Sequence, residues 1–194
     1  MAKTFQNCTN LVSVSMPKLN DLYHTDYLFS GCTKLETLVL DWSNMIRLGT
    51  GVFQNCQSLT KTIYVLPKLT TKIYSYVLTN NPYVTTFDIC ITTNTSGEQQ
   101  INGQSLEKNS SLNTLIIRST NYIIKLANIN AFTGTPFASG GTGGTLYVPQ
   151  SLISNYESAT NWSTILGYAN NSIEAIEGSY YETHYADGTT IPTT

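Results

Sequence analysis

Three cysteines recur at one spacing, and cysteine is the residue type here best suited to bind a metal ion or form disulfide bonds. Cys8, Cys32 and Cys56 are each separated by 24 residues, and a phenylalanine stands three residues before each of them, in the fragments FQNC, FSGC and FQNC. This spacing allows three interpretations: a metal site, a disulfide framework, or a packing unit that repeats along the chain.

A metal site is the least favoured of the three interpretations. Zinc needs four clustered ligands, which are usually supplied by cysteine pairs two to four residues apart. The chain contains no such pair, and only His24 and His184 could add imidazole ligands. We therefore expect no metal ion and no other cofactor.

Disulfide bonds between equivalent positions of stacked repeats are disfavoured by geometry. Neighbouring parallel strands would hold the Cβ atoms about 4.8 Å apart, beyond the usual 3.5–4.5 Å of a disulfide. Three equivalent cysteines also leave an odd partner, and the fourth, Cys90, follows the strand position Ile89 and should point the other way. We expect buried free thiols.

The sequence around the cysteines is an internal repeat. Three units begin at Phe5, Phe29 and Phe53, and two weaker units begin at Leu78 and Leu106. Six residues after each start stands an apolar residue, namely Leu11, Leu35, Leu59, Val84 and Leu112. A short β-prone stretch follows in each unit, and a degenerate sixth unit would run from Phe132 to a strand over Thr145–Val148.

The repeat explains the cysteine position without reactive chemistry. In the fourth and fifth units the same position holds Asn81 and Asn109. A position that accepts either residue is typical of leucine-rich repeats, because both side chains can form a hydrogen bond where the backbone turns inside the coil.

These features predict a leucine-rich-repeat solenoid of five to six coils over residues 1–148. Alternating apolar residues would form a short parallel β-sheet on one face, with irregular loops and short helical turns on the other. Segments such as Leu19–Tyr23 and Ile46–Leu48 would supply a second inward row on the opposite wall. No unit buries its apolar face alone, so neighbouring units must stack.

A different pattern follows the repeats. Pro149 favours a helix start, and Leu152, Ile153 and Tyr156 then follow at helical spacing. A further apolar group consists of Trp162, Ile165 and Leu166. We predict a C-terminal helical cap over residues 149–178, with a final strand at Ser172–Ile176. Residues 179–194 have little to pack, and we expect a flexible tail or a linker.

Composition disfavours several classes of function. Charged residues make up 11% of the 194 residues, and the net charge is −2. This charge, without a cluster of Lys or Arg, disfavours binding to nucleic acid or anionic membranes. No apolar run reaches the roughly 18 residues of a membrane span, so we expect no membrane insertion.

The N-terminus lacks a signal peptide, and the repeats begin without a capping segment. We therefore expect a fragment of a longer protein, with the export signal in a missing N-terminal part.

Catalytic residue patterns are scarce. The glycine-rich stretch Gly134–Thr145 resembles a phosphate-binding loop, but Gly141 stands where lysine is required. No Gly-x-Ser-x-Gly motif occurs, and two isolated histidines make a catalytic triad improbable. Solvent-exposed positions are expected for the candidate carboxylates Glu98, Glu107, Glu174 and Glu177. We expect no enzymatic activity; a hydrolase would need a catalytic cluster that the sequence does not contain.

The repeat resembles a known family. Phe-x-x-Cys-x-x-Leu followed by a strand and proline, as in Met16-Pro17-Lys18-Leu19 and Leu66-Pro67-Lys68-Leu69, resembles the BspA-type leucine-rich repeats of bacterial surface proteins. The resemblance spans about Phe5 to Val148, although unit four carries a polar insertion at Thr92–Ser105. Thr145–Leu166 also resembles a segment that ends such arrays in gut bacterial and phage-associated proteins.

This resemblance implies a non-enzymatic binding module at the bacterial cell surface or in the secreted fraction. Its role would be adhesion to a protein or glycan on a host or neighbouring cell, and we expect a monomer. The alternative is a structural spacer or a phage tail-fibre-type receptor-binding segment.

The expected binding surface is the outward sheet face, because repeat proteins commonly bind partners through extended faces. We predict binding through Ser13, Ser15, Glu36, Thr37, Val39, Lys61, Thr85, Thr86, Asp88, Asn113 and Thr114, with Val12 and Ile116 also pointing outward. Alternatively, Ser and Thr only fill exposed strand positions, where Thr has a high β propensity. A second candidate surface is the set of aromatic residues in turns, which could equally pack over coil edges: Tyr23, Tyr27, Trp42, Tyr74, Tyr76 and Tyr83.

Overall fold

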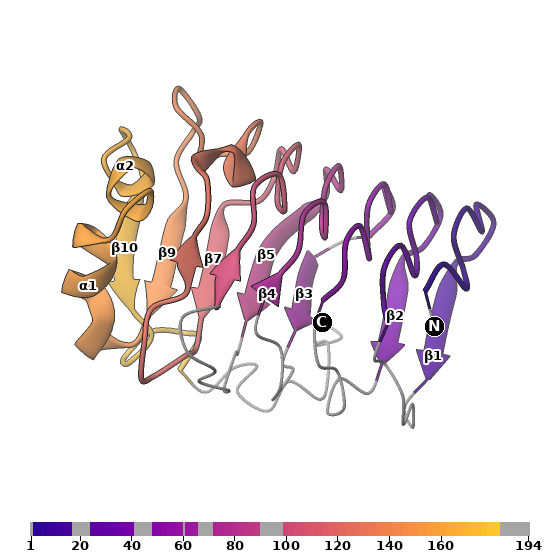
Figure 1. Ribbon diagram of the computed structural model, residues 1–194, viewed down its shortest axis with the longest axis horizontal. Helices are drawn as coiled ribbons and strands as arrows, with labels where there is room; N and C mark the ends of the chain where they lie inside the picture. The colour runs from indigo at the N-terminus through magenta and orange to yellow at the C-terminus, as the bar shows by residue number, and fades with distance from the viewer. Residues whose placement is uncertain are drawn as a thin grey trace.

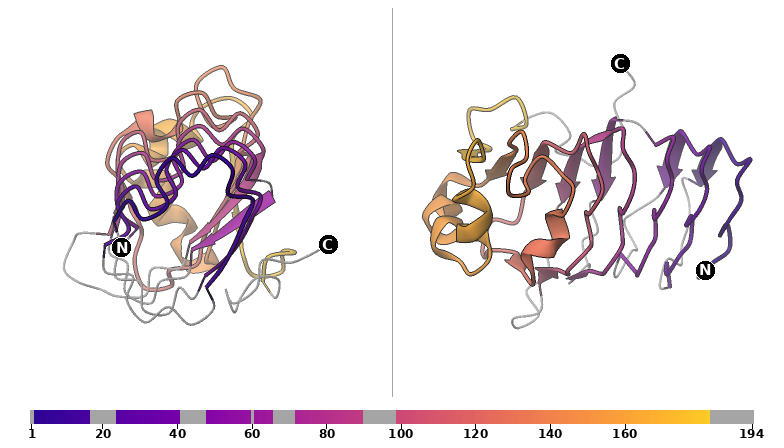
Figure 2. Two further views of the ribbon diagram at one scale, coloured as in Figure 1. Left: turned by 90° about the vertical axis from the view of Figure 1, so that its right-hand side faces the viewer. Right: turned by 90° about the horizontal axis from the view of Figure 1, so that it is seen from above.

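The chain is built from short strands that lie side by side in a row and are joined by turns (Figure 1). The computed structural model describes residues 2–16, 24–40, 48–59, 61–65, 72–89 and 99–182, with backbone alone for Leu40 and residues 61–65. Seen along the row, successive repeats overlap as one outline, as Figure 2 shows. The structure is therefore a repeat fold with parallel sheets.

Within the described residues the strands form three parallel sheets. The largest has the order β10-β9-β7-β5-β3 and consists of β3 (Lys61–Val65), β5 (Val84–Ile89), β7 (Thr114–Ile117), β9 (Thr145–Val148) and β10 (Ser172–Ala175). β1 (Ser13–Met16) pairs with β2 (Thr37–Leu40), and Figure 1 shows this pair continuing the same row. The strands predicted at Thr145–Val148 and at Ser172–Ile176 are confirmed.

Alternation of side chains buries one row of the five-stranded sheet in the core. Phe87, Leu115 and Leu146 stand in register on β5, β7 and β9, and all three are fully buried. Ile173 continues the row on β10 with a partly buried side chain. Burial of each large apolar side chain contributes about 1.5–3 kcal/mol, so this row holds neighbouring repeats together.

A second, smaller sheet forms the opposite wall of the core. It consists of β4 (Lys72–Ile73), β6 (Gln100–Ile101) and β8 (Lys125–Leu126). Leu48 extends this wall through a parallel bridge to Ile73. The prediction of a second inward row is therefore confirmed at Leu48, whereas Leu19–Tyr23 and Ile46 lie outside the described residues.

The segment interpreted as a polar insertion, Thr92–Ser105, contributes to this wall. β6 lies within it, and Ser105 is fully buried. The Ser105 hydroxyl donates to the carbonyl oxygens of Asn102 and Tyr74, at 2.6 and 2.8 Å. A buried, hydrogen-bonded serine is compatible with a core wall, which hydrophobic patterning alone does not reveal.

The turns between the walls are hydrogen-bonded from each repeat to the next. The backbone N–H groups of Phe5, Phe29 and Phe53 donate to Leu28, Val52 and Val77, at 3.0, 3.0 and 2.8 Å. A left-handed backbone conformation recurs in this turn at Asn7, Gly31, Asn55, Asn80, Lys108 and Gly134, and a second one stands four residues before the first five of these, at Lys3, Tyr27, Gly51, Tyr76 and Gln104. Asparagine and glycine adopt this conformation more readily than other residues, which explains the third position of FQNC and FSGC.

The cysteine position lies inside this turn and donates a hydrogen bond to the preceding repeat. Cys32 Sγ donates to the Phe5 carbonyl at 2.9 Å, and Cys56 Sγ donates to the Phe29 carbonyl at 3.0 Å. In the next unit Asn81 Nδ2 donates to the Phe53 carbonyl at 2.9 Å. The predicted equivalence of cysteine and asparagine at this position is confirmed.

The phenylalanines of the same motif stack along the row. The ring centroids of Phe5 and Phe29 are 5.4 Å apart, and those of Phe29 and Phe53 are 5.9 Å apart, with nearly parallel planes. Cys8, Cys32 and Cys56 are free thiols, and burial raises the pKa of both Cys32 and Cys56. A buried thiol with a raised pKa is a poor nucleophile. Cys90 lies outside the described residues.

Two short helices lie near the C-terminal end of the described chain. The 3-10 turn η1 (Ile129–Phe132) precedes β9, and η2 (Gln150–Leu152) leads into α1 (Ile153–Ser158) and then α2 (Trp162–Leu166). Tyr156 and Trp162 are fully buried. The helical spacing predicted for Leu152, Ile153 and Tyr156 is therefore confirmed, and the apolar group that follows them forms a second helix.

Side chains of the two helices and of the residue before α2 form hydrogen bonds with the backbone along the outer edge of β8. The N–H of Ile124 donates to the Tyr156 hydroxyl at 2.9 Å, and the Ile124 carbonyl accepts from Trp162 Nε1 at 2.7 Å. Asn161 Nδ2 donates to the Leu126 carbonyl at 2.8 Å. Side chains of the helical segment thus supply the hydrogen bonds that a further strand would otherwise make.

The hydrogen bond at the cysteine position gives a testable prediction. Cys56→Val should lower the free energy of unfolding by about 0.5–1.5 kcal/mol, because the buried Phe29 carbonyl loses the thiol donor of the next repeat and keeps only the N–H of Cys32. Cys56→Ser should lie closer to the wild type, because a hydroxyl can donate to the same carbonyl. Urea unfolding followed by circular dichroism measures both variants. Equal stability of the valine variant and the wild type would contradict the prediction.

Candidate functional site

The outer face of the five-stranded sheet carries two rows of side chains that run across the strands. Thr86, Thr114, Thr145 and Ser172 stand in register in the first row. In the same way, the second row contains Asp88, Ile116, Tyr147 and Glu174. Because their neighbours in the strands point into the core, these residues point outward.

A buried ion pair lies in the second row. Arg118 follows β7, and its Nε and Nη2 donate to the two carboxylate oxygens of Asp88, each at 2.8 Å. The Asp88 side chain is 0% exposed, and that of Arg118 is 10% exposed. Burial raises the pKa of Asp88, although the guanidinium of Arg118 opposes this shift. The forked contact fixes Arg118 over the sheet face.

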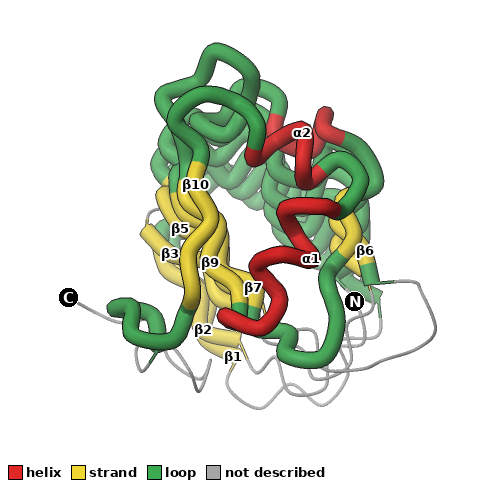
Figure 3. The backbone as a smooth tube through the Cα atoms, turned by 90° about the vertical axis from the view of Figure 1, so that its left-hand side faces the viewer, coloured by secondary structure: helices red, strands yellow, loops and turns green. Residues whose placement is uncertain are grey.

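The segment after β10 turns back along the outside of the sheet, as Figure 3 shows. Arg118 Nη1 donates to the Tyr181 carbonyl at 2.9 Å. The rings of Tyr147 and Tyr181 pack edge to face, with centroids 4.8 Å apart. Tyr181, which lies in the predicted C-terminal tail, therefore contacts the second row.

The predicted binding residues are consequently divided between open and covered positions. Exposed positions hold Ser13, Ser15, Glu36, Thr37, Val39, Thr85 and Asn113, and Thr114 is half-buried. Thr86 is 7% exposed, and Asp88 and Ile116 are fully buried. The expectation of an open face is wrong at these three positions: Arg118 and Tyr181 lie over the second row, which holds Asp88 and Ile116, and Thr86 is buried in the first row. The side chain of Lys61 lies outside the described residues.

An irregularity in β5 explains why two neighbouring threonines differ in exposure. The register of β5 against β3 shifts between Lys61 and Thr62, so that Val84 and Thr86 face consecutive residues of β3. Thr85 is the extra residue of this bulge and is exposed. A bulge interrupts the alternation on which a prediction of outward positions depends.

The open part of the face lies on the first two repeats. Val12 is 48% exposed and Val39 is 42% exposed, and hydroxyl side chains lie beside them. Ser13 is in register with Thr37, and Ser15 is in register with Val39. We call Val12, Ser13, Ser15, Glu36, Thr37 and Val39 the open face.

Two of the aromatic residues in turns contact a neighbouring repeat. Tyr27 and Tyr76 are partly buried. Lys3 Nζ lies 5.7 Å from the centroid of the Tyr27 ring, and the Tyr76 hydroxyl donates to Gln104 Oε1 at 2.7 Å. Tyr83 is 62% exposed. Tyr74 is also partly buried, whereas Tyr23 and Trp42 lie outside the described residues.

The described residues offer little reactive chemistry. In the described ranges, no group of three or more His, Cys, Asp and Glu side chains is placed to hold a metal ion. Glu107 is buried, contrary to the expected exposure, whereas Glu174 and Glu177 are exposed. The glycine-rich stretch makes a turn: a Cβ at Gly144 would lie 2.5 Å from the Phe137 ring. None of the described helices is long and apolar enough to cross a membrane.

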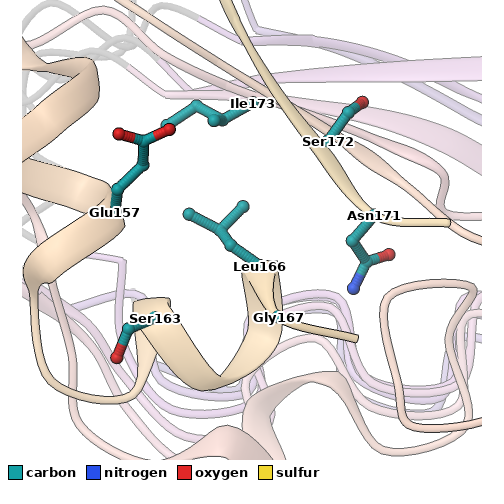
Figure 4. A pocket seen from close by; sticks show the side chains of 7 residues that line it. All are labelled: Glu157, Ser163, Leu166, Gly167, Asn171, Ser172 and Ile173. Atoms are coloured by element: carbon teal, nitrogen blue, oxygen red, sulfur yellow. The ribbon is translucent and has the colours of Figure 1, made fainter. Parts of the chain in front are cut away.

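A shallow pocket of about 400 Å³ lies between α1, α2 and β10. Figure 4 shows Glu157 of α1, Leu166 of α2 and Ile173 of β10 gathered around it. The pocket lies at the end of the row of repeats, away from the open face.

The sequence analysis did not predict the contacts that Arg118, Tyr147 and Tyr181 make over the second row. Tyr147 and Arg118 occupy outward positions of a period-two pattern, so strand alternation could have placed both on this face. Tyr181 carried no such signal, because its contact with Arg118 joins residues 63 positions apart.

Replacement of Arg118 should lower the stability of the protein, because the buried Asp88 carboxylate loses its partner. Arg118→Met should lower the free energy of unfolding by about 3–5 kcal/mol at pH 7, because Asp88 stays buried and charged. The loss should shrink as the pH falls and Asp88 gains a proton. Asp88→Leu combined with Arg118→Met should recover most of the stability. Urea unfolding of the wild type and of both variants measures these effects; a double variant no more stable than Arg118→Met would refute this account.

The raised pKa of Tyr147, in the second row, predicts a loss of stability at alkaline pH. Burial and the Glu174 carboxylate raise the pKa of Tyr147 to about 12. Since an unfolded tyrosine ionises near pH 10, the free energy of unfolding should fall as the pH rises from about 10 to 12. Tyr147→Phe should reduce this fall, and the exposed Tyr83→Phe serves as the control. Identical alkaline unfolding profiles for the two variants would count against the prediction.

Comparison with known proteins identifies the repeat. The family model described as BspA type Leucine rich repeat region (6 copies) matches residues 1–107 of the 194-residue chain. No curated protein matches the chain. The same turn conformation continues beyond the matched range, at Lys108 and Gly134. Since the match covers more than half of the chain, and the expected phenylalanine and cysteine rows are present, the chain belongs to the BspA-type leucine-rich repeat family.

Proposed function

We propose that this repeat domain is a non-enzymatic binding module, located on a bacterial cell surface or secreted. It adheres to a protein or glycan through the open face. The observation that carries the proposal is the exposure of two valines, Val12 and Val39, among hydroxyl groups on a sheet. Apolar side chains in contact with water favour contact with a partner, and the surrounding hydroxyls can donate and accept hydrogen bonds.

The architecture that presents this face is proposed to be a solenoid with a C-terminal helical cap. The repeated hydrogen bonds between turns support a continuous coil. The contacts of Tyr156, Trp162 and Asn161 with the edge of β8 support a capping role for the helices. A capped stack exposes its faces while its core stays dry.

A structural spacer or a phage tail-fibre-type segment is the second candidate function. It is favoured by the covered half of the sheet face, where Arg118 and Tyr181 occupy positions that a partner would need. In that case the repeats act as a scaffold, and the site of binding lies outside the open face.

The proposal is tested with a binding screen against extracellular matrix proteins and glycan arrays. The double variant Thr37→Lys and Val39→Lys should weaken binding of any partner found by at least about tenfold, because two long cations would occupy the contact surface. The matched control is Ser154→Lys with Thr164→Lys, which alters exposed positions on the two helices. Circular dichroism checks that each variant is folded.

Two results would overturn the proposal. Unchanged affinity in the open-face variant would move the binding site elsewhere. Absence of binding to every probe in the screen would favour the spacer.

A further inference from the structure

In the part of the chain that the structure describes, the last strand of the five-stranded sheet has no strand along its outer edge. The N–H groups of Ser172 and Ile176 donate to Gly144 and Val148 on the β9 side, at 3.0 and 2.9 Å. Because hydrogen bonding alternates along a parallel strand, Glu174 also bonds toward β9, and Ile173 and Ala175 direct their backbone groups away from it. Among the described strands none lies beyond β10, and the end view in Figure 3 shows it outermost.

At the same end of the molecule, the outer edge of β8 is hydrogen-bonded. The outer edge of β8 receives hydrogen bonds from Tyr156, Trp162 and Asn161. No side chain of the described helices makes an equivalent bond with the Ile173 or Ala175 backbone. The helical segment therefore closes one wall of the end and leaves the other wall open to a further strand.

A pocket lies where the side chain of an added strand would point. Ile173 belongs to the inward row, and its side chain lines the pocket together with Leu166. A residue in register with Ile173 on an added strand would lie about 4.8 Å further along the stack and point the same way. The volume of about 400 Å³ is sufficient for one large aliphatic side chain.

The charge around this edge is negative. Residues 126–194 contain no Lys or Arg, whereas all ten basic residues lie in residues 1–125. Glu157 lines the pocket, and Glu174 is exposed on β10. A partner with a basic residue is therefore electrostatically complementary to this end of the molecule, and an acidic partner is disfavoured.

We propose that the free edge of β10 and the adjacent pocket bind an extended, basic peptide segment of a protein partner. The segment adds a parallel strand to the sheet, places an aliphatic side chain in the pocket and sets a lysine or arginine beside Glu157. This site is separate from the open face and does not depend on it.

The probe is a synthetic peptide of sequence Lys-Val-Thr-Leu-Thr-Val-Lys, added to the full chain labelled with ¹⁵N. In the free protein the amide hydrogens of Ile173 and Ala175 should exchange with solvent quickly, while those of Glu174 and Ile176 should be protected. Saturating peptide should slow exchange at Ile173 and Ala175 by at least about tenfold, because both become hydrogen-bonded. A peptide methylated on alternate backbone nitrogens is the control that cannot complete the ladder.

Two variants separate the backbone contribution from the charge contribution. Ala175→Pro removes one free N–H without touching a bond to β9, and should weaken peptide binding at least about tenfold. Glu157→Lys should weaken it at least threefold and reduce its dependence on salt. Glu36→Lys on the open face changes the net charge equally and should leave peptide binding unchanged. Isothermal titration calorimetry measures all three.

Several outcomes would overturn the proposal. Exchange rates that do not change with peptide, or equal binding of the methylated peptide, exclude strand addition. Protection of Ile173 and Ala175 in the free protein would show that the edge is already occupied. Sedimentation equilibrium at two concentrations then distinguishes a second copy from a segment of the chain itself. If Ala175→Pro fails to fold, Glu157→Lys and the methylated peptide still decide the question.

Discussion

The structure depends on one constraint: backbone carbonyl groups buried at the turn of each repeat need hydrogen-bond donors. A thiol or an amide at one position meets this need, as Cys32, Cys56 and Asn81 do for the carbonyls of Phe5, Phe29 and Phe53. Each of these bonds joins one repeat to the one before it. The resulting spacing lets the phenylalanine rings stack and the strands pair in register. Each of these carbonyls also accepts a backbone N–H of its own repeat, so the loss of one bond between repeats would cost about 0.5–1.5 kcal/mol.

Regular spacing creates rows of outward side chains, but these rows are covered on the later repeats and exposed on the first two. On the later repeats the Asp88–Arg118 pair holds an arginine over the sheet, and this arginine holds the Tyr181 carbonyl. Desolvation of a charge pair is tolerated there because the guanidinium satisfies both carboxylate oxygens. On the first two repeats the described residues place nothing over Val12 and Val39, which stay exposed. The candidate binding surface is therefore the part of the sheet that the chain does not cover itself.

Much of the fold was predictable because its signals are local and periodic. The repeat step, the equivalence of cysteine and asparagine, the strand at Thr145–Val148 and the first C-terminal helix follow from residue types and their spacing. The second wall was predicted only in outline, because β4, β6 and β8 are two residues long and show no period. β6 lies in a polar stretch, where the buried Ser105 is compensated by hydrogen bonds that patterning does not detect.

The sequence by itself determined the family, the repeat length and which side chains point into the core, because these depend on residues a few positions apart. Only the tertiary structure decided which outward positions meet solvent. Strand alternation gives the direction of a side chain and says nothing about what lies above it. Asp88 and Ile116 point outward as expected, yet both are fully buried. The contact of Arg118 with Tyr181, across 63 residues, covers this part of the face through distant parts of the chain.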